Sequence, residues 1–150
     1  MRVVIQRVSE AKVVVDEVTT GSIKTGLLIL VGIEEEDDEN DVDWLVKKTN
    51  QLRIFNDDEG KMNLSVQDIN GSFLVISQFT LFASTKKGNR PSFIRSAKPE
   101  KAEALYELFK KTMAEESGKP VESGIFGADM KVFLVNDGPV TIVIDTKNKE

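Results

Sequence analysis

The sequence predicts an α+β fold in a single domain over residues 1–150, with a curved, mainly antiparallel sheet or an open β-barrel and two helices. Strand signals dominate, because about seven or eight short segments are rich in β-branched and aliphatic residues. The two helical patterns occur singly between groups of strands, so the regular alternation of a parallel α/β fold is absent. A chain of 150 residues is also large enough to bury one substantial core.

Aliphatic and β-branched residues mark the first strands of the sheet. These strands are expected over residues 3–8, 11–15 and 27–31. Between them, residues 16–26 are rich in glycine, serine, threonine and aspartate, which favour turns.

An acidic run over residues 34–43 leads into the first helix. Asn40 or Asp41 is expected to cap this helix, and the acids complement the positive end of its dipole. Its apolar face is predicted from residues at helical spacing, namely Val42, Leu45, Val46, Thr49 and Leu52.

A turn at residues 56–60 and a weak strand at residues 62–66 are expected next, followed by a strong strand at residues 73–78. The second helix is predicted to begin with Pro99 in its first turn and to end at Gly118. Its apolar face consists of Ala102, Leu105, Tyr106, Phe109 and Met113.

The last part of the chain is predicted to form three more strands. They are expected around Val121, over residues 131–135 and over residues 140–145.

The chain contains no histidine and no cysteine. Any chemistry must therefore proceed without an imidazole base, a thiolate or a His/Cys metal site, and neither a metal nor a cofactor is expected. No apolar run approaches the ~20 residues that a membrane-spanning helix needs. Arg2 and Arg7 also interrupt the apolar stretch that a signal peptide would require, so we expect a cytoplasmic protein without a membrane partner.

Charge is unevenly distributed along the chain, although its net value is −5. Residues 34–43 carry eight acids and no base, whereas residues 86–101 carry six bases and one acid. A local basic surface can steer a polyanion such as RNA, whatever the net charge. The alternative is that both segments are solvated surface and balance each other.

The segment Ser77-Gln78-Phe79-Thr80 follows the strong apolar strand and offers two hydroxyls, a carboxamide and backbone N–H groups. Such donors can stabilise an oxyanion, and one donor can contribute ~3 kcal/mol. They are not strong bases at neutral pH. The alternative is a strand end at which Ser77 and Thr80 merely satisfy turn N–H groups.

The dipeptide Gly138-Pro139 lies between two apolar strand segments. If its bond were cis, the flanking carbonyls would point the same way and could accept from an ammonium group. The alternative is a hairpin turn built from residues 136–139.

Three other residues are candidates for a binding site. Arg7 follows an apolar strand start and could be half-buried, or its head could be solvated. Phe126 and Met130 could line a pocket with a ring and a thioether, or could simply fill the core.

Taken together, these segments resemble the D-aminoacyl-tRNA deacylase family over essentially the full length of the chain. No single segment is specific, but their combination, order and spacing are. The resemblance rests on VVIQRV at residues 3–8, SQFTL at 77–81, NRPSF at 89–93, GIFGADM at 124–130 and NDGPVT at 136–141.

The resemblance implies a homodimeric enzyme that hydrolyses the ester between a D-amino acid and the 3′-terminal adenosine of tRNA, and that also accepts mischarged glycyl-tRNA. It implies a cis Gly138-Pro139 bond that is inserted into the partner subunit's active site, with Arg7 helping to hold the motif. It further implies that Ser77 to Thr80 form the adenosine and ester end of the pocket, which Phe126 and Met130 would line.

The chemistry of the residues agrees with this resemblance. An aminoacyl ester is already activated, and its ribose carries a 2′-hydroxyl that can assist attack. Such a substrate needs positioning and oxyanion stabilisation more than a protein base. A rigid main-chain wall at the α-carbon would exclude an L side chain but could not reject glycine.

Three alternatives remain open at the level of sequence. A non-catalytic RNA-binding β-domain would use residues 86–101 to bind tRNA without ester turnover. A hydrolase of small free esters would leave that basic cluster without a use. Thr80 could act as an acyl-accepting nucleophile, although no partner base is apparent in the sequence.

Overall fold

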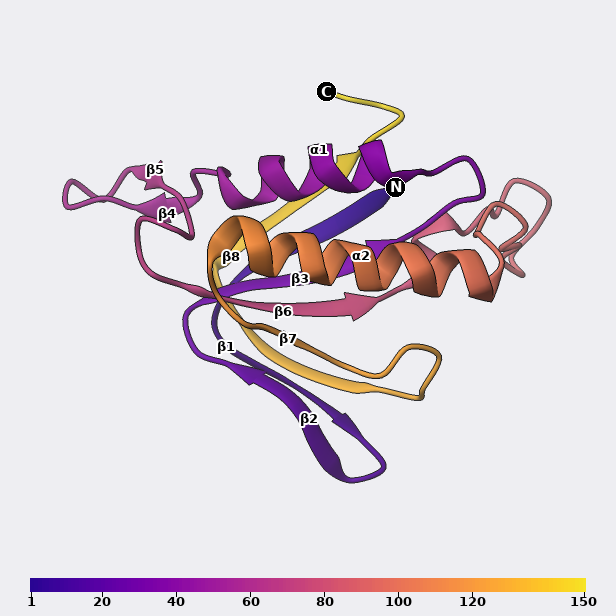
Figure 1. Cartoon of the computed structure of the whole chain (residues 1–150), viewed down its shortest axis with the longest axis horizontal. Coiled ribbons are helices and arrows are strands. Elements are labelled where there is room, and N and C mark those ends of the chain that lie inside the picture. Colours follow the sequence, from indigo (N-terminus) through magenta and orange to yellow (C-terminus); the bar gives the residue numbers. More distant parts are fainter.

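The computed structural model describes all residues from 1 to 150 and confirms the α+β class (Figure 1). Its strands are β1 (Arg2–Val15), β2 (Val18–Ile23), β3 (Gly26–Gly32), β4 (Phe55–Asn56), β5 (Met62–Leu64), β6 (Ser72–Ser77), β7 (Val121–Ser123) and β8 (Lys131–Asp145). Its helices are α1 (Glu39–Asn50), α2 (Pro99–Ser117) and the short 3-10 helix η1 (Phe79–Phe82). None of these helices has both the length and the apolar character needed to cross a membrane.

The main sheet is mixed and nearly closes into a barrel. Its strands run in the order β2-β1-β3-β6-β7, and β8 pairs with the other edge of β1. β1 is antiparallel to β2, β3 and β8, whereas β6 is parallel to β3 and β7. The two ends of the order approach each other, because a Cβ placed on Gly21 of β2 would lie 2.8 Å from the Ser123 carbonyl oxygen of β7.

Apolar side chains form a core on each face of the sheet. The larger core lies under α1 and α2, which run side by side across one face (Figure 1). The smaller core lies on the opposite face and includes Val8, Leu28 and Leu74. Because β3 and β6 are parallel, their carboxyl ends meet at one edge of the barrel, close to the start of α2.

The prediction for residues 16–26 needs a correction. The turns there are confined to Asp16 and Glu17, whose φ angles are 47° and 66°, and to residues 24–25, whereas β2 occupies residues 18–23. Two consecutive residues with positive φ suit the right-handed twist of a two-residue hairpin. Gly21, which suggested a turn, lies inside β2. A glycine fits there because β7 approaches its α-carbon closely.

The cap of α1 also differs from the prediction. Asp38, rather than Asn40 or Asp41, is the capping residue, and its side chain accepts from the backbone N–H groups of Asn40 and Asp41. Asp41 reciprocates by accepting from the Asp38 backbone N–H at 3.0 Å, which completes a capping box. The remaining acids of the first turn complement the helix dipole, as predicted.

The second helix is confirmed at both ends. Pro99 lies in its first turn, and Gly118 ends it in the left-handed conformation with φ of 67°. All five residues of the predicted apolar face are buried.

Residues 131–145 form one continuous strand instead of two strands joined by a hairpin, so the hairpin interpretation of residues 136–139 is wrong. In the pairing of β8 with β1, Asn136 lies opposite Val8 and Thr141 lies opposite Gln6. Residues 137–140 therefore bulge outwards opposite the single residue Arg7. The bulge places Gly138 and Pro139 on the surface of the chain.

Candidate active site

A largely apolar cavity of about 560 Å³ opens where β3 and β6 end. Ser77, Gln78 and Phe79 line one side of it, and Phe126 and Met130 line the other. The structure therefore brings together five of the residues that the sequence singled out. Thr80 follows them in η1, where its hydroxyl accepts from Gln78 Nε2.

The geometry of η1 leaves hydrogen-bond donors at the cavity. Gln78 still pairs with β3, since its N–H donates to the Val31 carbonyl at 2.8 Å, and the chain then turns sharply. No side chain caps this turn, so the N–H groups of Phe79 and Thr80 have no partner within it. Free, rigidly held N–H groups beside a cavity can bind an oxyanion.

Aromatic rings frame the cavity mouth. Phe79 is 55% exposed, and its ring meets Phe93 edge-on with centroids 5.1 Å apart. On the other wall, Phe126 packs against Tyr106 at 5.9 Å. Phe93 was noted in the sequence only within NRPSF, because nothing local shows that this loop lies beside η1.

The loop over residues 124–130 depends on a close approach at Gly124. A Cβ at this position would lie 2.3 Å from Met130 Sδ, so any larger residue would displace the thioether from its present place. No ionisable side chain lines the cavity. The sequence contains no histidine or cysteine that could act as a base, and no carboxylate or lysine lines this cavity either.

The β8 bulge and Arg7 form a second cluster. The Gly138-Pro139 bond is cis. Arg7 is buried, with 8% of its surface exposed, and its Nε donates to the Asp137 carbonyl at 2.8 Å. Its Nη1 donates to the Ile54 carbonyl at 2.7 Å. The interpretation of Arg7 as a residue with a solvated head is therefore wrong, because its guanidinium is used within the fold.

Gly138 adopts a φ of +142°, which side-chain-bearing residues rarely adopt. An added Cβ would lie 2.9 Å from Arg7 Nη2 and 2.8 Å from Val140 Cγ2. The bulge is also held at its far end, because the Val140 N–H donates to Asn136 Oδ1 at 2.8 Å. Arg7 and Asn136 thus fix the bulge from both sides.

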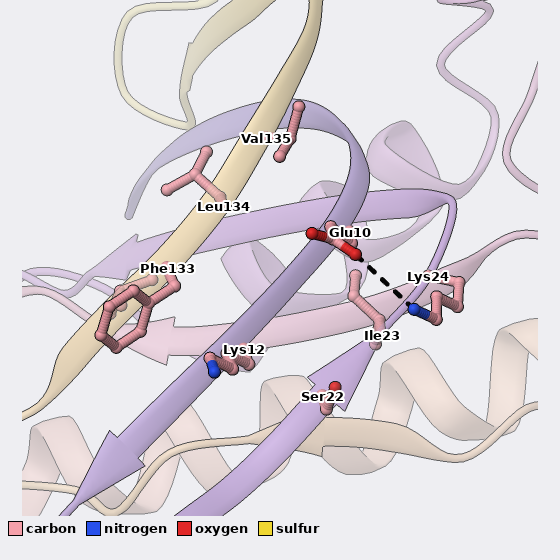
Figure 2. A pocket seen from close by; sticks show the side chains of 9 residues that line it. Glu10, Lys12, Ser22, Ile23, Lys24, Phe133, Leu134 and Val135 are labelled. Atoms are coloured by element: carbon pink, nitrogen blue, oxygen red, sulfur yellow. Dashed lines mark ion pairs between the residues drawn. The ribbon is translucent and has the colours of Figure 1, made fainter.

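The two clusters do not meet within one chain. Arg7, Gly138 and Pro139 are absent from the wall of the cavity that contains Ser77. Close to the bulge, β8 pairs with β1 along one edge only, and several of its apolar side chains are exposed, namely Phe133, Leu134, Val135 and Val143. Figure 2 shows three of them above a groove of about 670 Å³, opposite Glu10 and Lys24, which form an ion pair at 3.6 Å.

The basic cluster is partly neutralised by the acidic run. Arg95 pairs with Glu34 at 2.8 Å, and Lys101 Nζ donates to the Glu35 carbonyl. Lys86, Lys87 and Arg90 are exposed on the neighbouring loop, and none of these forms an ion pair. The two charged segments therefore neutralise each other at one ion pair, and Lys86, Lys87 and Arg90 remain without an acidic partner on the loop that leads to Phe93 of the cavity wall.

An ionic network lies beside the start of α1. Lys147 Nζ donates to Asp41 at 2.8 Å. Burial would raise the pKa of Asp41, but hydrogen bonds from Lys147, Thr146 and the Asp38 backbone lower it from 3.8 to about 2. The Asp41 carboxylate is therefore ionised at neutral pH and stabilises the fold there.

Comparisons with known proteins agree with this geometry. The family model described as D-Tyr-tRNA(Tyr) deacylase matches residues 4–145. The chain is 59% identical to a D-aminoacyl-tRNA deacylase of Flavobacterium johnsoniae and 61% identical to one of Bacteroides fragilis, each over 150 residues and the whole of both chains.

Two solved structures have the same architecture. One is the c-Myc DNA Unwinding Element Binding Protein, with a TM-score of 0.91 and 37% identity, covering 97% of this chain and 99% of that one. The other is a probable eukaryotic D-amino acid tRNA deacylase, with a TM-score of 0.80 and 18% identity, covering 95% and 97%; at this identity it supports the fold alone. The family match and the full-length relatives decide the assignment, and the chain belongs to the D-Tyr-tRNA(Tyr) deacylase family.

Proposed function

We propose that the chain is a D-aminoacyl-tRNA deacylase, a hydrolase that releases a D-amino acid and tRNA from their ester. One observation carries the proposal: an apolar cavity without ionisable side chains is lined by Phe79, the first residue of a turn in which the N–H groups of Phe79 and Thr80 have no partner. This arrangement suits an activated ester that needs an oxyanion site rather than a base. We infer that the chain acts as one domain, in the cytoplasm.

The proposed reaction follows from that geometry. The terminal adenosine enters between the Phe79–Phe93 wall and Phe126, and the ester carbonyl points at the N–H groups of η1. Water attacks the carbonyl carbon and gives a proton to the ribose 2′-hydroxyl, which passes its own proton to the departing 3′ oxygen. The bond from the carbonyl carbon to the 3′ oxygen then breaks, and this oxygen leaves as the ribose hydroxyl. The bond from Gln78 Nε2 to the Thr80 hydroxyl fixes the side chains beside this path.

We propose that two copies of the chain complete each site. The bulge at Gly138 and Pro139 is exposed and lies apart from the cavity of its own chain. The free edge of β8 and its exposed apolar side chains offer a second copy a sheet edge to cover. A second copy docked there would carry each bulge towards the other's cavity.

The bulge is the proposed chiral filter. Its main chain is held in place by Arg7 and Asn136 and carries no side chain at Gly138. Placed against the α-carbon of the substrate, such a wall leaves room for a hydrogen and collides with an L side chain. Glycyl-tRNA has no side chain to exclude and is therefore an expected second substrate.

The free cations Lys86, Lys87 and Arg90 are the proposed contact with the tRNA acceptor end. They lie on the loop that continues from η1 and precedes Phe93, which lines the cavity. Contacts with phosphates supply much of the affinity of proteins for nucleic acids and weaken as salt rises.

The direct test compares matched D-aminoacyl-, L-aminoacyl- and glycyl-tRNA, with loss of the ester bond as the readout. Rapid loss from the D and glycyl esters and slow loss from the L ester is expected. A D-aminoacyl-tRNA ending in 2′-deoxyadenosine should bind but turn over slowly. tRNA binding without ester loss would instead establish a non-catalytic RNA-binding domain, and full turnover of the deoxy substrate would exclude assistance by the 2′-hydroxyl.

A further inference from the structure

The donor-bearing turn η1 is too short to hold its own position. It spans four residues, Phe79–Phe82, and one backbone hydrogen bond closes it at each end. The Leu81 N–H donates to the Gln78 carbonyl at 3.3 Å, and the Ala83 N–H donates to the Thr80 carbonyl at 3.1 Å. Short 3-10 turns have poor hydrogen-bond geometry, so contacts from outside must fix the direction of the Phe79 and Thr80 N–H groups.

Arg2 supplies such a contact from the first residue of β1. Its Nη1 donates to the Leu81 carbonyl at 2.8 Å. Its Nε and Nη2 donate to Asp145 Oδ2 at 2.9 and 2.8 Å, and Asp145 lies directly opposite Arg2 in the pairing of β1 with β8. The guanidinium also lies 4.8 Å from the centre of the Phe82 ring.

The carboxylate that orients Arg2 is itself well held. Burial would raise the pKa of Asp145, but the Lys147 N–H and the Arg2 guanidinium lower it below its usual value. Asp145 is therefore ionised at neutral pH. The planar guanidinium of Arg2 therefore binds two elements at once: Nε and Nη2 donate to Asp145 of β8, and Nη1 donates to Leu81 of η1.

We propose that Arg2 is a positioning residue for hydrolysis, which holds η1 through the Leu81 carbonyl so that the Phe79 and Thr80 N–H groups face the ester. This inference rests on the proposed function and extends it to a residue outside the cavity. Arg95 also lies near the Phe82 ring, at 5.3 Å, but it pairs with Glu34 and donates no hydrogen bond to the turn. Arg2 is thus the guanidinium that ties η1 to the sheet.

The informative variant is Arg2→Lys. Lysine has one nitrogen and keeps the charge, so it can pair with Asp145 but cannot serve Asp145 and Leu81 in the same forked geometry. We expect kcat for D-aminoacyl-tRNA to fall about 10- to 100-fold, because an error of about 1 Å in a reacting group can cost 100-fold. KM should stay within about threefold, because the cavity wall and the free cations are unchanged.

Two variants control for effects that do not involve η1. Arg53→Lys removes a comparable contact, from Nε to the Asn63 carbonyl at 2.7 Å, beside β4 and β5 and away from the cavity. Asp41→Asn weakens the ionic network at α1 and lowers thermal stability without touching η1. Both should keep wild-type kcat when assayed well below their Tm.

The outcomes separate this inference from the proposed function. Loss of kcat in Arg2→Lys with a near-wild-type Tm supports positioning. An Arg2→Lys enzyme with wild-type kcat, or one whose kcat loss is matched by Asp41→Asn, overturns it while the deacylase proposal stands. Should the lysine variant fold poorly, Arg2→Gln is assayed well below its Tm instead. The same result is expected, namely a lower kcat with little change in KM. A wild-type protein that hydrolyses no ester overturns both.

Discussion

Gly32 at the end of β3 offers the sharpest test of the site, because η1 rests directly on its α-carbon. An added Cβ would lie 2.9 Å from Leu81 Cβ, 3.1 Å from the Gln78 carbonyl oxygen and 3.2 Å from Phe82 Cε2. Ordinary contacts between such atoms begin at 3.4 Å, so Gly32→Ala must push η1 outwards by about 0.5 Å. The donors of Phe79 and Thr80 would move with it.

The expected cost has two parts. Overpacking of this kind destabilises proteins by about 1–3 kcal/mol. At this chain length each kcal/mol lowers Tm by about 2–4 °C. The displaced donors should lower kcat about tenfold or more, with a smaller effect on KM, because misplacement acts mainly on the transition state.

The assay is the rate of ester loss over a range of D-aminoacyl-tRNA concentrations up to saturation, which gives kcat and KM, with Tm measured in parallel. Gly118→Ala is a matched control, since its φ of 67° makes alanine strained while its Cβ would meet nothing within 4 Å. It should lose stability by about 1 kcal/mol and keep kcat. A Gly32→Ala enzyme with wild-type kcat, or a Gly118→Ala enzyme with the same kcat loss, would refute the reasoning.

Three further predictions follow from other parts of the structure. Thr80→Ala should retain activity within about tenfold if the backbone N–H is the donor, whereas complete loss in a single-turnover assay would favour a hydroxyl nucleophile. Reversal of Lys86, Lys87 and Arg90 to glutamate should raise KM for aminoacyl-tRNA and flatten its salt dependence without changing Tm; unchanged binding would place the tRNA elsewhere. Because the pKa of Asp41 falls from 3.8 to about 2 on folding, its stabilisation is present above pH 4 and is lost as the pH falls towards 2. Asp41→Asn should therefore lower the unfolding free energy by about 2 kcal/mol at pH 7 but have little effect at pH 2, which denaturant titrations at both pH values would check.

The sequence predicted the elements whose signals are local. α2 has proline at its start, glycine at its end and an unbroken apolar face, so both its limits could be read directly. The cap of α1 could not, because several acids compete within the acidic run and only the folded turn selects Asp38. β2 was missed because Gly21 suggests a turn. The glycine is explained instead by the close approach of β7, which is distant in sequence.

The site shows the same limit. Ser77 to Phe79 could be identified because they follow a strong strand, and Phe126 and Met130 were candidates because a ring and a thioether can line a pocket; the cavity joins them. The bulge at Gly138 was harder to foresee, because residues 136–139 suit a hairpin equally well and only pairing with β1 distinguishes the two. The contact of Arg2 with Leu81 had no signal at all, since it depends on how η1 folds back over the start of β1.

A cavity wall without ionisable groups has consequences for inhibition and for the pH profile of the enzyme. Reagents that alkylate thiols or modify imidazoles find no target there, and Met130 Sδ is the one sulfur atom exposed to oxidants in that wall. With no protein group titrating at the ester, the rate should follow the ionisation of the substrate itself. The α-ammonium of the bound amino acid and the ribose hydroxyl would then set the pH optimum, which should shift when the substrate changes and stay constant when the protein is mutated.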